Sequence, residues 1–389
     1  MFSTTAGTVL LLPLLVLVAV TFPAARAVQT HKHTVVAAYV PEYRTGIDWN
    51  FYAQHVTDLI LFSVEPLENG TIKSYFPIDD DGSDSALTKA HAAQQQSIGS
   101  PHLLPNSKGL NLLLCVGGAG RSKYFSTVTS TKKKRTEFLT NLRNTLVAKQ
   151  LNGLDFDWEV PSTRQEVHQY QLLLQEAGAL LHATPPKDPT RPPFILSATV
   201  HAWQDLGKPA YDALDRIHLM SYDGQGTTHS SYAMAQQDVR RLAALHCPLS
   251  KIVLGVPFYG RGLVNPGLTL TYEDLVKKVG ADLNPMLDVM GTGKNKIGFN
   301  NILTVQKKMK FAIKSKILGV FAWEIGQDSS DGETSLTKAI SDVRMGIKRK
   351  FHKKNPAKDP RFSKKLKEKK KKKKKKTDKK KRIKRNFDL

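Results

Sequence analysis

Acidic side chains stand at every second position near the end of one apolar segment, Leu151–Glu159. They are Asp155, Asp157 and Glu159. Because alternate side chains of a β-strand share a face, all three are expected to point to the same side. The opposite face would carry Leu154, Phe156 and Trp158. Like charges on one buried face disfavour joint ionisation, so at least one proton is expected to be retained or shared at neutral pH.

Glu159 is the acid nearest the carboxyl end of this predicted strand. In a barrel of parallel strands that end opens at the mouth, where the active sites of such barrels lie. A carboxyl group with a raised pKa at the mouth can protonate the oxygen of a glycosidic bond. We therefore predict Glu159 as a general acid. The alternative is a solvated strand edge, and the alternation with large apolar side chains argues against it.

Short apolar runs rich in Val, Ile and Leu predict eight strands. The runs are nearly continuous rather than alternating, which is typical of parallel strands buried on both faces. They are Thr34–Val40, Asp58–Val64, Leu110–Gly117, Leu151–Trp158, Phe194–Val200, Arg216–Tyr222, Lys251–Pro257 and Leu318–Trp323.

Helical periodicity occupies the intervals between these runs. The predicted helices are Lys134–Lys149, Glu166–Leu181, Met234–Leu245 and Ile302–Ile313. Strands that alternate with helices indicate βαβ units, and eight of them predict a (β/α)8 TIM barrel, with a doubly wound open sheet as the rival. Between the seventh and eighth strands we expect one helix, Tyr272–Val279, and irregular loops.

Most of the net charge of +24 lies at the C-terminal end of the chain. From Lys348 to Leu389, 24 Lys or Arg residues stand against four acids, so this segment carries +20 and the rest only +4. Such a composition predicts a disordered tail over residues 347–389. Its lysines could attach to an anionic polysaccharide or membrane surface, or serve only to solubilise the chain.

The N-terminal segment has the pattern of a secretory signal peptide. An apolar run, Val9–Val20, precedes Ala25-Arg26-Ala27, which resembles a cleavage site. We expect residues 1–27 to be removed and the protein to be secreted, with an uncleaved anchor as the alternative. Secretion makes a nucleic-acid partner for the tail unexpected. The cysteines, Cys115 and Cys247, are expected to be free thiols, and no zinc-site spacing is found, so no metal is expected.

Five segments, in order along the chain, resemble the signatures of glycoside hydrolase family 18, the chitinases. Residues 152–159 resemble D-G-x-D-x-D-x-E, with Asn152 in place of the first Asp, from which we expect a shifted proton network. The others are Cys115–Gly118 for S-x-G-G, Met220–Asp223 for M-x-Y-D, Gly255–Arg261 for G-x-P-x-Y-G-R, and Gly319–Glu324 for the eighth-strand ending. The resemblance runs from about Thr34 to Ser341 and favours the barrel over the open sheet.

The resemblance implies substrate-assisted, retaining hydrolysis of β-1,4-linked N-acetylglucosamine polymers. Glu159 would protonate the leaving oxygen and then activate water. Asp157 would orient the substrate's acetamido group, Asp155 would share a proton beneath it, and Tyr222 would hydrogen-bond the acetamide oxygen. Trp323 would form the floor under the sugar at the cleavage point.

Further residues are assigned by the same resemblance to the binding of chitin or N-acetylglucosamine oligosaccharides. They are Met220, Tyr39, Asp223, Tyr259 and Arg261, with Asp223 and Arg261 as polar supports. No cofactor is implied, and a monomer is expected.

The resemblance leaves two other functions open: a chitinase-like lectin that binds without cutting, and an endo-β-N-acetylglucosaminidase acting on N-glycans. Because such lectins lose the terminal acid of the fourth-strand motif, the presence of Glu159 favours the enzyme. Family members often insert an α+β domain between strands seven and eight; the interval here is too short for a full one. The predicted catalytic domain spans residues 28–346.

Overall fold

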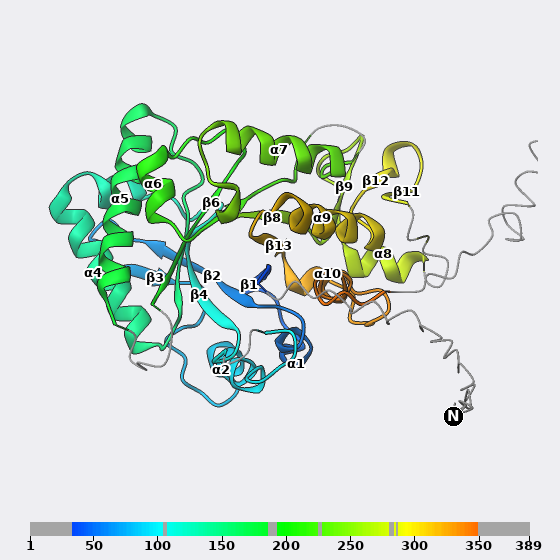
Figure 1. The fold of residues 1–389 in the computed structure, drawn as a ribbon, viewed down its shortest axis with the longest axis horizontal. Helices are drawn as coiled ribbons and strands as arrows, with labels where there is room; N and C mark the ends of the chain where they lie inside the picture. The colour runs from blue at the N-terminus through cyan, green and yellow to red at the C-terminus, as the bar shows by residue number, and fades with distance from the viewer. Residues whose placement is uncertain are drawn as a thin grey trace, which may run out of the picture.

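The computed structural model describes residues 33–103, 107–185, 193–224, 228–279, 284 and 287–348. Within these ranges, eight parallel strands close into a barrel, because β1 pairs with both β2 and β13 (Figure 1). The barrel strands in chain order are β1 (Val35–Pro41), β2 (Asp58–Pro66), β4 (Asn111–Gly117), β5 (Gly153–Asp157), β6 (Ile195–Val200), β7 (Arg216–Leu219), β8 (Ile252–Pro257) and β13 (Gly319–Trp323).

Helices pack around the outside of this barrel (Figure 1). They are α1 (Trp49–Ala53), α2 (Ala86–Gln96), α3 (Phe125–Thr129), α4 (Lys132–Ala148), α5 (Arg164–Ala183), α6 (Lys208–Ala213), α7 (Tyr232–Ala244), α9 (Ile302–Ser315) and α10 (Leu336–Arg344). The short strand β3 (Ile72–Ser74) pairs antiparallel with the end of β2. The eight predicted strands and four predicted helices are confirmed to within a few residues, and the open sheet is excluded.

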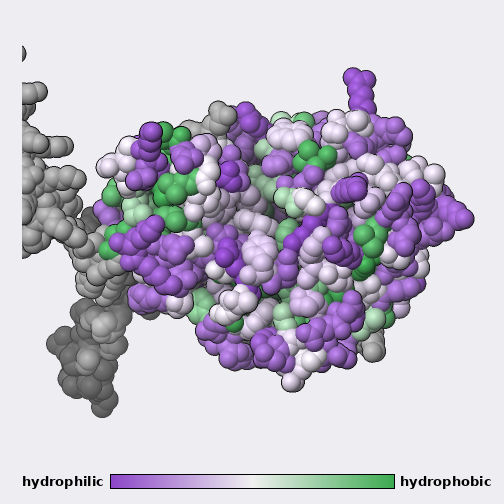
Figure 2. Space-filling model, turned by 180° about the vertical axis from the view of Figure 1, so that it is seen from behind, coloured by the Kyte–Doolittle hydropathy of each residue, from purple (hydrophilic) through white to green (hydrophobic). Residues whose placement is uncertain are grey.

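The core has two layers because each barrel strand is buried on both faces. The larger cluster fills the space between strands and helices, as with Leu154 and Phe156 of β5. The smaller cluster lies inside the barrel and includes Tyr39, Cys115 and Phe321. Hydrophobic residues on the face seen in Figure 2 lie in small groups among hydrophilic ones, so most apolar area is turned inward.

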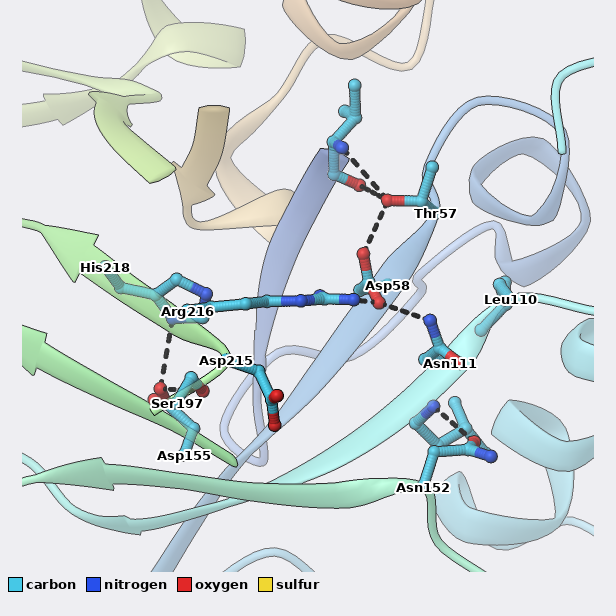
Figure 3. Close-up of polar contacts among 12 residues, drawn as sticks. Thr57, Asp58, Leu110, Asn111, Asn152, Asp155, Ser197, Asp215, Arg216 and His218 are labelled. Atoms are coloured by element: carbon cyan, nitrogen blue, oxygen red, sulfur yellow. Dashed lines mark hydrogen bonds and ion pairs between the residues drawn. The ribbon is translucent and has the colours of Figure 1, made fainter. Parts of the chain in front are cut away.

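An ion pair crosses the amino-terminal end of the barrel. Arg216, the first residue of β7, reaches Asp58, the first residue of β2, at 2.8 Å (Figure 3). Asp58 is fully buried and also accepts hydrogen bonds from Thr57 Oγ1 at 2.5 Å and Asn111 Nδ2 at 2.6 Å. A buried carboxylate with these partners is compensated, which an isolated one would not be.

The interval between the seventh and eighth barrel strands is more ordered than expected. The predicted helix is present as α8 (Tyr272–Val279), but a small antiparallel sheet stands where irregular loops were expected. Its order is β10 (Thr269–Thr271), β9 (Tyr259–Gly262), β12 (Ile297–Gly298) and β11 (Val289–Met290). Because β9 follows β8 almost directly, this sheet forms one side of the barrel's mouth.

Several predictions about the chain concern residues that the structure does not describe. The signal peptide, residues 28–32 and the tail from residue 349 onward lie outside the described residues. Within the described ranges, no helix combines the length and apolar character needed to cross a bilayer. Cys115 and Cys247 are both buried free thiols, as expected.

Candidate active site

The three acids of the Leu151–Glu159 segment lie on the inner face of the barrel, at the carboxyl end of β5. Asp155 and Asp157 are 0% and 3% exposed, and Glu159, two residues beyond the strand, is half-buried. The parallel register sets Asp155 beside Cys115 of β4 and Ser197 of β6. Alternation along one strand therefore delivers three carboxyl groups to one side, ordered from barrel interior to mouth.

Two glycines after β4 let the end of β5 come close. A Cβ on Gly117 would lie 2.4 Å from the carbonyl oxygen of Asp157, and one on Gly118 would lie 2.4 Å from the ring of Phe62. Both glycines have positive φ values, of 103° and 98°. The backbone N–H of Gly118 donates to the Asp157 carbonyl at 2.7 Å, so the loop after β4 fixes the level of Asp157.

Asp155 is surrounded by hydrogen-bond donors. Tyr39 Oη donates to Oδ2 at 2.7 Å, and Ser197 Oγ donates to Oδ1 at 2.5 Å. Thr199 Oγ1 lies 3.2 Å from Oδ2, and His218 Nδ1 lies 3.0 Å from Oδ1. Burial alone raises the pKa of Asp155, but His218, Ser197 and Tyr39 more than offset it and hold the pKa below its usual value.

Asp157 and Glu159 form a second, more weakly supported pair. Burial raises the pKa of Asp157 well above its usual value, and the charges of Glu159 and Asp155 raise it further. Burial also raises the pKa of Glu159, against the hydrogen bonds from the Ala119 backbone and Asp157 that lower it. Asp157 Oδ1 is buried without a hydrogen-bond partner among the described residues. A proton held by the three acids is therefore favoured on Asp157 and Glu159 over Asp155.

A separate polar group lies after β7, two barrel strands from β5. Asp223 accepts hydrogen bonds from Tyr259 Oη at 2.6 Å and from Arg261 Nη2 at 2.9 Å, and His229 Nδ1 lies 3.3 Å away. Burial raises the pKa of Asp223, but the bonds of His229 and Tyr259 and the charge of Arg261 bring it below its usual value. Asp223 is thus an anion, whose charge helps to raise the pKa of Glu159.

Aromatic rings line the space beside these acids. Trp323 is half-buried, with its ring 5.3 Å from that of Tyr39 and 4.8 Å from that of Phe62. Tyr222 is half-buried too, and Gly255 gives it room, because a Cβ there would lie 2.8 Å from the Tyr222 ring. Met220 is 8% exposed and belongs to the inner cluster. Tyr39 lies deeper than a lining residue, bonded to Asp155.

Sequence reasoning missed four residues that the structure brings to this region. Ser197, Thr199 and His218 bond the Asp155 carboxylate. The signal was present, since Ser197 and Thr199 alternate on one strand, and His218 stands two residues before Met220 on another. The fourth is Trp203, which is 62% exposed just beyond β6 and stacks on His201 at a centroid distance of 5.5 Å.

Asn152 does not take part in the proton network, and the shift expected from it is wrong. Its Oδ1 accepts from the backbone N–H of Leu112 and from Nε2 of Gln94, each at 2.8 Å. It precedes β5 and points away from Asp155, towards α2 (Figure 3). Asn152 is therefore a structural link between β4 and α2.

Among the residues that the structure describes, no group of three or more His, Cys, Asp or Glu side chains is placed to hold a metal ion. What the site offers is a pair of acids with raised pKa values, a group of aromatic rings and an ionised Asp223. These are the parts needed to protonate a leaving oxygen over a bound ring.

The sequence matches one protein family, Glycosyl hydrolases family 18, over residues 81–328. The similar proteins include "Nod factor hydrolase protein 1" of Medicago truncatula, 28% identical over 57% of this chain and 70% of its own length. A class V chitinase of Arabidopsis thaliana is 24% identical over 62% of this chain and 76% of its own length.

The fold is similar to that of a solved class V chitinase from Nicotiana tobaccum, a mutant in complex with NAG4. The two superimpose with a TM-score of 0.66 at 18% identity, over 80% of this chain and 99% of that one. At this identity the likeness concerns the fold.

The raised pKa of Asp157 predicts a pH-dependent cost to stability. A group whose pKa is higher in the folded protein contributes stability that is complete below its unfolded pKa and is lost as pH rises through the folded value. Asn imitates the protonated acid and does not titrate. The melting temperature of Asp157→Asn minus that of the wild type should therefore increase from pH 4 to pH 8. The expected increase is at least about 2 °C, which corresponds to about 1 kcal/mol.

Asp81→Asn is the matched control, because Asp81 is an exposed carboxylate. The difference between its melting temperature and that of the wild type should stay constant from pH 4 to pH 8. A difference between Asp157→Asn and wild type that stays constant with pH would contradict the shift. Thermal unfolding followed by circular dichroism across this pH range decides the question.

Proposed function

Because this chain belongs to glycosyl hydrolase family 18, we propose that it is a secreted chitinase that hydrolyses β-1,4-linked N-acetylglucosamine polymers, with Glu159 as the general acid and base. Membership of the family supports the assignment as a chitinase-type glycosidase. The observation that carries the finer proposal is the Asp157–Glu159 pair. Burial raises the pKa of both carboxyl groups, which favours a proton held on this pair at the mouth of the barrel.

In the first step, the carbonyl oxygen of the substrate's own acetamido group attacks the anomeric carbon. The bond from that carbon to the glycosidic oxygen breaks, and Glu159 transfers its proton to the departing oxygen. The product is a cyclic oxazolinium ion, whose positive charge the carboxylate of Asp157 stabilises. Tyr222 donates a hydrogen bond to the acetamide oxygen, and Trp323 supports the apolar face of the sugar ring.

In the second step, Glu159 is ionised and removes a proton from a water molecule. The water oxygen bonds to the anomeric carbon, and the bond from that carbon to the acetamide oxygen breaks. The acetamide is restored, Glu159 is protonated again, and two inversions retain the configuration. Asp223, ionised beside Arg261, supports the raised pKa of Glu159 throughout.

Two exposed aromatic residues favour a long substrate over a short one. Tyr43 follows β1 and is 53% exposed, and Trp203 follows β6 and is 62% exposed. Counted around the barrel in either direction, β1 and β6 are four strands apart, so the two rings stand on opposite sides of the mouth. We infer that a chitin chain crosses the mouth from one ring to the other, with sugar faces on both.

One named relative supports a second substrate. The Medicago truncatula protein is called a Nod factor hydrolase, and the chain matches it over 70% of its length. The same catalytic residues would serve either substrate, so assaying Nod factor beside chitin oligomers distinguishes them. A lectin, the remaining alternative, would bind these oligomers and cut none of them.

The first prediction concerns the acid. Glu159→Gln should lower turnover of chitin hexamer by at least about a hundredfold, because Gln keeps the shape of Glu and has no proton to transfer. The dissociation constant for the hexamer, measured by calorimetry, should change little. Glu137→Gln, an exposed acid on α4, is the control and should retain activity. More than half of wild-type turnover in Glu159→Gln would remove Glu159 from its role.

The second prediction concerns chain length. Trp203→Ala should lower kcat/KM about fivefold for a hexamer and little for a trimer, since one lost stacking contact is worth about 1 kcal/mol. Leu249→Ala is the control, because Leu249 is 42% exposed just before β8, at the other end of the barrel. Equal effects on hexamer and trimer would show that Trp203 contacts no distant sugar.

The third prediction concerns the two ends of the chain. We propose that the signal segment directs secretion and that the basic tail attaches the enzyme to anionic surfaces. Expressed in a eukaryotic secretory host, the protein should appear in the medium beginning at Val28. Deletion of residues 348–389 should lower the salt concentration needed to elute it from an acidic polysaccharide column and leave hexamer turnover unchanged. Identical elution of both forms would contradict the attachment.

A further inference from the structure

His218 is a buried imidazole at the centre of the barrel that the mechanism above does not use. It lies on β7 with its side chain turned inward and is 0% exposed. Its Nδ1 lies 3.0 Å from Asp155 Oδ1 (Figure 3). The same atom lies 3.1 Å from Tyr39 Oη. Its Nε2 is buried and has no hydrogen-bond partner among the described residues.

The partners of His218 decide where its proton lies. A proton on Nε2 alone would leave a buried N–H unpaired and turn a lone pair of Nδ1 towards a carboxylate, and both are unfavourable. A proton on Nδ1 meets the carboxylate directly. We therefore place a proton on Nδ1, donated to Asp155.

The other groups around Asp155 are consistent with an ionised carboxylate. Ser197 and Tyr39 each have one hydroxyl proton, and both point at Asp155 oxygens. Thr199 Oγ1 lies 2.7 Å from Tyr39 Oη and 3.2 Å from Asp155 Oδ2, so its one proton can go to either oxygen. With His218 added, Asp155 receives at least three donors on two oxygens, so it has no need of a proton of its own.

We propose that His218 is a positioning residue for hydrolysis, which keeps Asp155 ionised through Nδ1 and thereby confines the transferable proton to the Asp157–Glu159 pair. This rests on the proposed function, because it assigns His218 to that reaction. His218 lies beneath the mouth and acts only through Asp155.

Removal of the Nδ1 donor has two coupled consequences. Asp155 becomes more basic and competes for the last proton of the three acids, where the proton cannot reach the glycosidic oxygen. Turnover should fall at every pH, since only part of the population then holds the proton on the pair. Because Asp155 can then also hold the proton, the apparent pKa for loss of the last proton from the three acids should rise.

The remaining charged or titratable groups that face this pair are few and can be named. They are Tyr39 from β1, Asp58 from β2, Cys115 from β4, Asp157 and Glu159 from β5 and its continuation, and Arg216 from β7. Asp58 and Arg216 neutralise each other at the barrel floor. Burial raises the pKa of Tyr39 and of Cys115, so neither carries charge in the working range.

The test compares two variants of similar size. His218→Leu removes the donor, and His218→Asn places an amide N–H near the position of Nδ1. On chitin hexamer, His218→Leu should lose about tenfold or more in kcat, the effect of one hydrogen bond to a charged group, with little change in KM. The alkaline limb of its kcat–pH profile should move upward by about one pH unit. His218→Asn should move both quantities back towards the wild type.

A change of leaving group separates this role from a merely structural one. An umbelliferyl glycoside of the same sugar departs with little help from an acid, so the loss in His218→Leu should shrink on that substrate. A loosened fold would reduce both rates equally and leave the pH profile in place. Equal losses on the two substrates, or an unmoved alkaline limb, would overturn the proposal.

The titration of Asp155 gives a readout that needs no activity. The ¹³C carboxyl signal of Asp155, assigned with Asp155→Asn, should titrate at higher pH in His218→Leu than in the wild type. Should His218→Leu fail to fold, Ser197→Ala removes another donor to the same carboxylate and predicts the same direction. An unchanged Asp155 titration in the folded variant would overturn the inference. Wild-type protein that is inactive on every oligomer would overturn the proposed function, and the role of His218 in that reaction with it, even where the titration shifts as expected.

Discussion

The mutual repulsion of three carboxyl groups on one buried strand face is the constraint to which the rest of the barrel mouth responds. Joint ionisation of Asp155, Asp157 and Glu159 is unfavourable because the first two are buried and the third is half-buried, and the chain of β5 and the two residues after it keeps them close together. The structure divides them instead. Hydroxyl and imidazole donors gather around Asp155, and the other two acids share what remains. Because the donors surround Asp155, a proton is favoured on Asp157 and Glu159.

Other features of the barrel maintain this difference between the acids. Gly117 at the end of β4 allows the chain to approach the backbone of Asp157 closely. Asp223 holds its negative charge beside Tyr259 and Arg261, near enough to Glu159 to raise the pKa of that group without bonding to it. Trp323 and Phe62 pack their rings against one another at the mouth. The neighbours of the three acids thus differ in kind: donors surround Asp155, and a negative charge acts on Glu159.

The barrel could be predicted from the sequence because its strands are buried on both faces and so appear as continuous apolar runs. The shared face of the acids could be predicted because side chains alternate between the two faces of a strand such as residues 153–157. The small sheet beside the mouth was missed since β11 and β12 have only two residues each, too few for any periodicity. Asn152 was misjudged because its motif position suggests the proton network, whereas its side chain meets Gln94 and Leu112. His218 contacts residues on strands that are distant in the sequence, and no local sequence pattern predicts such contacts.

The ion pair between Asp58 and Arg216 gives the barrel two electrically independent ends. Its charges cancel within 2.8 Å at the floor, so little field from them reaches the acids at the mouth. Substitutions at the floor can therefore change how firmly the barrel holds together while the chemistry stays the same, and loops at the mouth can diverge without disturbing the foundation. Selection can therefore act on the stability of the barrel through its floor and on substrate specificity through the loops at its mouth.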